Sequence, residues 1–248
     1  MANSGQDSTA SGREQFANTH WSVVLLAGQS ASPLCQSALE KLCESYWYPV
    51  YAFLRRQGHP SADAKDLTQA FFTKFIEKKF LSAVNPAKGK FRSFLLKALK
   101  HFLANEWDRQ RAEKRGGKHT LISLDEQTAE SRYLLEPVSN ESPEALYDQR
   151  WALTVLDETL RRLKADCETA GNAKQFKELE IYLSSEPGEG GYSAVAERLQ
   201  MSTGAVAVAV HRLRQRYGEL LRKEIGRTVS TPAEIAEEMR FLFSVFSK

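Results

Sequence analysis

The sequence of 248 residues lacks the features that define several large classes of proteins. Its three cysteines, Cys35, Cys43 and Cys167, form neither a CxxC pair nor an even set that suits disulfides. No apolar run approaches the ~18 residues that a membrane-spanning helix requires. The N-terminal stretch, MANSGQDSTASGREQ, has neither the basic nor the apolar region of a signal peptide. These absences predict a reduced, cytoplasmic protein with no membrane insertion.

Motifs of the common catalytic sites are also missing. The GGK at 116–118 is not a P-loop, because Ala112 stands where its first glycine is needed and His119 where Ser or Thr must follow. There is no GxSxG and no HExxH. A metal site using His59, Asp63 and Asp66 would lack further ligands at suitable spacing. We therefore expect no enzyme activity, no metal and no cofactor.

Charge is distributed unevenly along the chain, although the net charge is only +3. Residues 97–118 carry seven Lys/Arg against three Asp/Glu, and residues 211–227 carry six against two. Residues 123–149, between them, hold seven acids and one Arg. Two basic segments separated by an acidic segment suit two separate contacts with a polyanion. The alternative is that each basic segment is only the solvated face of a helix.

Apolar residues recur at helical spacing through most of the chain, and signals for strands are almost absent. Gly58 and Pro60 end a first long pattern, and Ser61 begins the next. Thr231, Pro232 and Glu234 predict a capping box at the start of a last helix. The fold class is therefore all-α, with two helical modules joined by an acidic linker and followed by a C-terminal helix. The expected divisions are a partly disordered extension at 1–30, a first module at 31–117, the linker at 118–149, a second module at 150–230 and a C-terminal helical extension at 231–248.

Residues 192–223 predict a helix-turn-helix. Its buried faces are expected to be Val195, Ala196 and Leu199 on the first helix and Val206, Val210 and Leu213 on the second. Ser202 or Thr203 is placed to cap the second helix. The cations along the exposed side favour DNA binding over a hairpin that only packs, since phosphate contacts need Lys and Arg.

The segment KHFLANEWDRQRAEKRGGK, from residue 100 to 118, interleaves rings with basic residues. This combination suits single-stranded nucleic acid, where bases stack on rings and cations follow the backbone. The alternative is that Phe102 and Trp107 belong to the apolar face of the helix, which leaves only the basic side chains for binding.

Several of these segments together resemble the bacterial RNA polymerase sigma factors of the extracytoplasmic-function (ECF) group. DAKDLTQAFFTKF is similar to the family's core-binding helix, KGKFRSFLLKALKHFLANEWDRQR to the helix that opens the downstream promoter element, and YSAVAERLQMSTGAVAVAVHRLRQRYGELLR to the helix-turn-helix that binds the upstream element. FANTHWSVVL, CESYWYPVYAFLRRQG and KRGGK resemble more narrowly a subset found in planctomycetes. The resemblance covers most of residues 16–230.

The resemblance implies a sigma factor that directs transcription initiation by binding core RNA polymerase and promoter DNA. It assigns core-polymerase binding to Asp63, Asp66, Gln69 and Phe72. It assigns binding of the melted strand to Arg92, Lys97, Lys100, His101, Asn105, Arg109 and Arg111. It assigns duplex binding to Ser202, Thr203, Ala205, Ala207, Val208, His211, Arg212, Arg214 and Arg216. An anti-sigma factor is a further partner that the resemblance suggests.

Some residues depart from the family pattern. Ala205, Ala207 and Val208 replace polar or basic readers of bases, so we expect the recognition helix to dock on phosphates more than to discriminate bases. Residues 231–248 extend beyond the two-domain plan, and their apolar side chains must pack on a module or serve as a regulatory contact. A stand-alone helix-turn-helix regulator, or a sigma-like interaction protein with reduced DNA binding, remains the alternative function.

Overall fold

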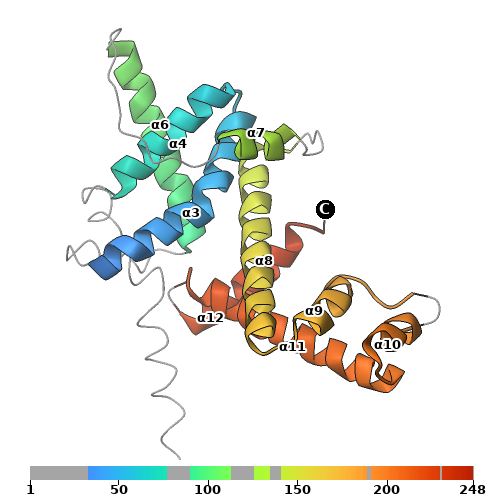
Figure 1. Cartoon of the computed structure of the whole chain (residues 1–248). Helices are drawn as coiled ribbons and strands as arrows, with labels where there is room; N and C mark the ends of the chain where they lie inside the picture. The colour runs from blue at the N-terminus through green and yellow to red at the C-terminus, as the bar shows by residue number, and fades with distance from the viewer. Residues whose placement is uncertain are drawn as a thin grey trace, which may run out of the picture. The chain divides into compact units, whose positions relative to one another are not determined.

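The computed structural model describes residues 33–76, 90–112, 126–134, 141–188, 191–229 and 231–247. Side chains are described in these ranges except at 33–44, 108–112 and 126–128. Every regular element in the described ranges is a helix, which confirms the predicted all-α class for this part of the chain (Figure 1).

In chain order the helices of the described ranges are α3 (Pro33–Arg56), α4 (Ser61–Ile76), α6 (Phe91–Ala112), α7 (Glu126–Leu134), α8 (Pro143–Thr169), α9 (Ala173–Leu179), the 3-10 helix η1 (Glu180–Leu183), α10 (Ser193–Leu199), α11 (Thr203–Gly226) and α12 (Pro232–Ser244). The boundaries that the sequence predicts at Gly58, Ser61 and Thr231 agree with the end of α3 and the starts of α4 and α12. The structure differs from the expectation at 118–149, because α7 lies inside the segment expected to be a linker.

The chain divides into two compact units. The first takes its described residues from Met1–Thr154 and Ile225–Lys248, and the second from Val155–Glu224. These divisions differ from the boundaries expected from composition, at 149/150 and 230/231. The observed divisions fall inside α8 and inside α11. The expected boundary at 149/150 also lies within a helix, since α8 starts at Pro143 and continues unbroken past residue 150. A change in charge along the sequence therefore does not mark a boundary here.

Aromatic rings form the core of the first unit, between α3, α4 and α6. Phe71 of α4 packs against Phe75 of the same helix and Phe102 of α6, with ring centroids 5.8 and 5.6 Å away. Phe91, at the start of α6, meets Tyr46 of α3 edge-on at 5.0 Å. All five rings are buried. Tilted and edge-to-face contacts are the favoured arrangements of aromatic pairs, so they fix how α4 and α6 present their outer faces.

The C-terminal helix α12 belongs to the first unit. It begins with the predicted capping box, in which the Thr231 backbone N–H donates to Glu234 Oε2 at 3.0 Å. Leu242 and Val245 are buried, whereas Phe246 remains 46% exposed. Of the two roles expected for this segment, packing on a module is therefore observed.

A buried ionic cluster joins α6, α8 and α12. Arg92 Nε donates to Glu238 Oε1 at 3.0 Å, and its Nη1 donates to Asp148 Oδ1 at 2.5 Å. The guanidinium carbon lies 3.9 Å from the ring centroid of Phe241 and 4.9 Å from that of Trp151. Burial lowers the pKa of the guanidinium, but the hydrogen bonds and charges of Glu238 and Asp148 outweigh it and raise the pKa above its ordinary value.

This cluster corrects one assignment made from the resemblance. Arg92, expected to bind a melted strand, is 7% exposed and holds two carboxylates of its own chain. Its neighbour Lys90 lies 2.9 Å from the second oxygen of Glu238. Lys90 and Arg92, at the start of α6, thus pair with carboxylates of the first unit and are not free to bind DNA.

We predict that Glu238→Gln destabilises the first unit by about 3 kcal/mol, the lower end for breaking a buried ion pair, because Asp148 still pairs with Arg92. The control is Glu237→Gln. Its carboxylate is 57% exposed and 3.8 Å from Lys90, so its loss should cost less than about 1 kcal/mol. Urea unfolding of both variants measures the difference. Equal, small losses would contradict a structural role for the cluster.

Candidate nucleic-acid interface

The second unit contains the predicted helix-turn-helix, formed by α10 and α11. Its two helices bury the faces that the sequence predicts, and these form one apolar cluster with α9, made of Leu179, Val195, Ala196, Val206 and Val210. Leu199 and Leu213 pack against the edge of this cluster. The core therefore fixes which side of α11 is left for a ligand.

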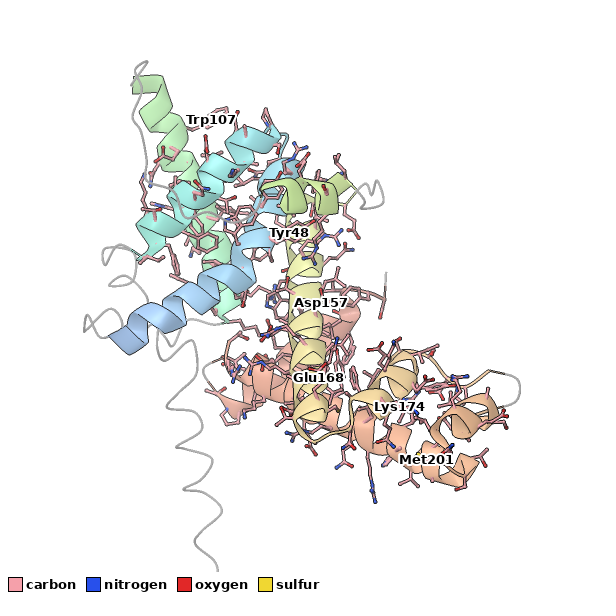
Figure 2. All side chains as sticks on the ribbon, viewed as in Figure 1. Tyr48, Trp107, Asp157, Glu168, Lys174 and Met201 are labelled. Carbon is pink, nitrogen blue, oxygen red and sulfur yellow. The ribbon has the colours of Figure 1, made fainter. Side chains whose placement is uncertain are left out.

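A tight turn connects the two helices (Figure 2, where Met201 is labelled). Gln200 adopts the left-handed region at φ 54°. Met201 N–H donates to Ala196 O at 2.9 Å, and the Ala205 N–H donates to Ser202 Oγ at 3.2 Å. Of the two candidate caps of α11, Ser202 therefore provides the side-chain bond.

The exposed start of α11 offers few hydrogen-bonding groups. Ser202, Thr203 and Ala205 are exposed, Ala207 is half-buried, and Val208 is 51% exposed. An aliphatic surface of this kind can contact thymine methyl groups but cannot form the bidentate bonds that distinguish bases strongly. The start of α11 therefore lets a ligand come close to the helix but offers few groups that could select among bases.

Two of the four expected phosphate contacts on α11 have partners within the protein. Arg214 donates to the backbone oxygens of Tyr182 and Ser185 at 2.8 and 2.9 Å and lies 3.0 Å from Glu186 Oε1. It therefore fastens the segment after α9 to α11.

Arg216 is the second cation with an internal partner. It pairs with Asp166 at 3.0 Å and Glu219 at 3.5 Å, and the bond to Asp166 raises the pKa of its guanidinium. His211 and Arg212 are exposed, and neither forms an ion pair within the described ranges. These two side chains remain available to a polyanion on α11.

The outer face of α6 gathers most of the other expected nucleic-acid contacts. Lys97, Lys100, His101 and Asn105 are all exposed. His101 Nδ1 lies 3.0 Å from Asn105 Nδ2, and Lys100 Nζ lies 2.7 Å from Glu144 of α8. The Lys100 pair is half-exposed on both sides, so it can exchange for a phosphate at little cost.

Trp107 differs from the expectation that it belongs to the apolar face of its helix. Trp107 is 62% exposed (labelled in Figure 2). Phe102, five residues earlier, is buried. An exposed indole on a helix with exposed cations is suited to stacking on a base. The side chains of Arg109 and Arg111 lie outside the described residues.

The polymerase-binding residues expected on α4 separate into two groups. Asp63 and Asp66 are exposed, and Gln69, one turn further on, is half-buried. Phe72 is 2% exposed and packs on Phe71 with ring centroids 5.2 Å apart. Phe72 is therefore a core residue, and the two carboxylates form the accessible part of the expected docking face.

Other kinds of site find no support in the described part of the chain. No group of three His, Cys, Asp or Glu side chains lies close enough there to hold a metal ion. None of its helices is both long and apolar enough to span a membrane. Comparison of the whole chain with protein-family models, curated proteins and solved structures finds no match.

We predict that Gln200→Gly stabilises the second unit by about 0.5–1 kcal/mol. The left-handed backbone costs a non-glycine residue about 1–2 kcal/mol, and the greater flexibility of glycine when unfolded offsets part of the gain. Thermal unfolding measures it, with Gln200→Ala as the control that keeps the strain. An equal effect of both substitutions would show that the turn stores no such strain.

Proposed function

We propose that this protein is a sigma factor of the ECF type, which acts in the cytoplasm and directs bacterial RNA polymerase to promoters without catalysing a reaction itself. The observation that carries the proposal is the exposed side of α11, where His211 and Arg212 follow a helix N-terminus capped by Ser202. A capped, cation-bearing second helix after a tight turn is the element that helix-turn-helix proteins place in the major groove.

The basic faces of α11 and α6 suggest that each helix binds a different form of the promoter DNA. On α11, the small side chains Ala205 and Val208 allow close approach to the duplex, and His211 and Arg212 contact phosphates. On α6, Trp107 and the exposed cation Lys97 suit a single strand, in which an unstacked base finds a ring. We infer that α11 positions the protein on the duplex and that α6 supplies more of the sequence preference.

Docking on polymerase is assigned to the first unit. Asp63 and Asp66 stand one turn apart on α4, which the aromatic core holds in place through Phe71. Two exposed carboxylates on the same side of a helix suit a basic surface on a partner. Such charges affect the orientation and the association rate of a complex more than its affinity. An anti-sigma factor is the further partner proposed from the resemblance.

The alternative is a helix-turn-helix regulator, or a sigma-like interaction protein, that acts without joining polymerase. The aliphatic exposed face of α11 favours this alternative, because it limits base readout. Reconstituted transcription with core polymerase separates the functions: a sigma factor supports promoter-dependent initiation, and a regulator does not.

We predict that Arg212→Ala weakens duplex binding and lowers the salt slope of log K by about one, as expected for one lost phosphate contact. The effect of Arg212→Ala on stability should be small.

Arg214→Ala should instead destabilise the second unit by about 1–2 kcal/mol, because it removes charge-assisted bonds to two carbonyl oxygens. Fluorescence titrations at several salt concentrations, with thermal unfolding, test both variants. An unchanged slope for Arg212→Ala would reject its role.

We predict that Asp66→Arg abolishes association with core polymerase, since the substitution reverses the charge at the centre of the docking face. Glu197→Arg is the matched control: it makes the same charge change at an exposed residue of α10. Co-purification with core polymerase measures both. Retained binding by Asp66→Arg would place the docking surface elsewhere, and lack of binding by the unmodified protein would reject the proposed function.

A further inference from the structure

One carboxylate attaches α7 to the rest of the first unit. Glu130 accepts two hydrogen bonds from Arg55 of α3, at 2.7 Å from Nη2 and 3.0 Å from Nε, and a third from the hydroxyl of Tyr51. Tyr51 Oη lies 3.1 Å from Oγ of Ser61, the first residue of α4. A single side chain of α7 thereby connects the last turns of α3 with the start of α4.

Charge and hydrogen bonding hold Glu130 in this place. The hydrogen bonds from Arg55 lower the pKa of the Glu130 carboxyl, which therefore stays ionised at neutral pH. Burial and the bond to Glu130 raise the pKa of Tyr51 to about 12, so its hydroxyl keeps the proton that it donates. The contact is bidentate and charge-assisted, which makes it specific in geometry.

The other contacts of α7 include little apolar burial. The guanidinium of Arg132 lies 4.2 Å from the ring centroid of Tyr48. Ala129 is the one buried apolar residue of α7 among those whose side chains are described, and Leu134 is 70% exposed. Partly exposed ion pairs and cation–π contacts each contribute about 1 kcal/mol or less. The docked position of α7 is thus held by contacts that can be exchanged.

The length of α7 makes its order depend on this docking. The helix has nine residues, and isolated helices shorter than about 12–15 residues are marginal in water. Loss of the contacts at Glu130 leaves Ala129 and the cation–π contacts of Arg132 with Tyr48 and of Arg55 with Tyr133. We expect these to be too weak to keep so short a helix docked and ordered. Such a segment has two states, a docked helix and an open chain, separated by a small free energy.

We propose that α7 is a reversible latch, closed over the corner of α3 and α4 in the free protein and opened when the first unit binds core polymerase. This inference rests on the proposed function. The hydrogen-bond network of Glu130 ends on Ser61, two residues before Asp63 on the same helix. Asp63 and Asp66 are exposed beside the docked α7, so the competition is for Ser61 and Tyr51 and not for the carboxylates themselves. A polymerase surface that extends from Asp63 over Ser61 displaces α7 from this corner, and the closed latch lowers the apparent affinity.

The test compares Glu130→Gln with the unmodified protein and with Glu237→Gln. Both substitutions remove one negative charge from the first unit, but Glu130 holds Arg55 and Tyr51, whereas the carboxylate of Glu237 is 57% exposed and 3.8 Å from Lys90. Hydrogen exchange of the amides of 126–134 reports whether the latch is open. The affinity for core polymerase is measured for the same three proteins.

We expect Glu130→Gln to speed exchange across 126–134 by about tenfold or more, as the loss of a charge-assisted pair allows. Because only the open state binds, we expect its affinity for polymerase to rise by about three- to tenfold. Glu237→Gln should resemble the unmodified protein in both measurements.

The remaining outcomes decide separately on the latch, on its gating of polymerase binding and on the proposed function. Unchanged exchange in Glu130→Gln would overturn the latch itself. Faster exchange with unchanged or weaker polymerase binding would overturn the gating and leave the proposed function intact. Absence of polymerase binding in all three proteins would reject the proposed function together with the gating, while the exchange data would still decide whether α7 opens.

Discussion

The guanidinium of Arg92 is the group around which the first unit is arranged. A buried cation costs several kcal/mol unless opposite charges and hydrogen-bond acceptors surround it. Here Glu238 and Asp148 supply the charges, and the rings of Phe241 and Trp151 cover the guanidinium. These partners come from α8 and α12, so the cluster explains why the first unit needs segments distant in the sequence. The C-terminal helix is consequently part of the fold and not an appendage.

The same competition between internal and external partners determines which cations of α11 are available. Arg214 and Arg216 are occupied by carbonyl oxygens and carboxylates of the second unit. His211 and Arg212 are exposed on the same helix. If α11 binds DNA as proposed, a count of its basic residues overstates the number of phosphates that it neutralises by Arg214 at least, because the half-exposed Arg216 pair can exchange. The distinction matters because the salt dependence of binding follows that number and not the net charge.

Local signals in the sequence predicted the helices but not the partners of their polar residues. Gly58 and Pro60, the capping box at Thr231, and the period of Val206 and Val210 depend on neighbours within a few residues, and the structure confirms them. The pairing of Arg92 with Glu238 spans 146 positions. From sequence alone, a cation in the first turn of α6 looks the same whether it faces water or a distant carboxylate.

Two further differences have the same origin. The resemblance placed Phe72 on the docking face, and helical spacing favoured the alternative that Trp107 lies on the apolar face, yet Trp107 is exposed and Phe72 is buried. Spacing gives the angle of a side chain around its helix, but the neighbouring helix must be present at that level to cover it. α7 went unpredicted because its nine residues, EQTAESRYL, carry almost no apolar period, and Ala129 is the one buried apolar residue among its described side chains. Short elements held by charge are the ones that sequence patterns miss.

Carboxylates of the chain itself thus pair with arginines in both units. Glu238 neutralises Arg92, Glu130 neutralises Arg55, and Asp166 neutralises Arg216. The first pair is buried and permanent, because separating it would leave an unpaired charge in an apolar core. The third is about half-exposed on both sides, where an ion pair contributes little and exchanges readily. The second, whose side chains are 18% and 22% exposed, lies between these two cases. Burial therefore decides which carboxylates fix the fold and which can yield to a partner.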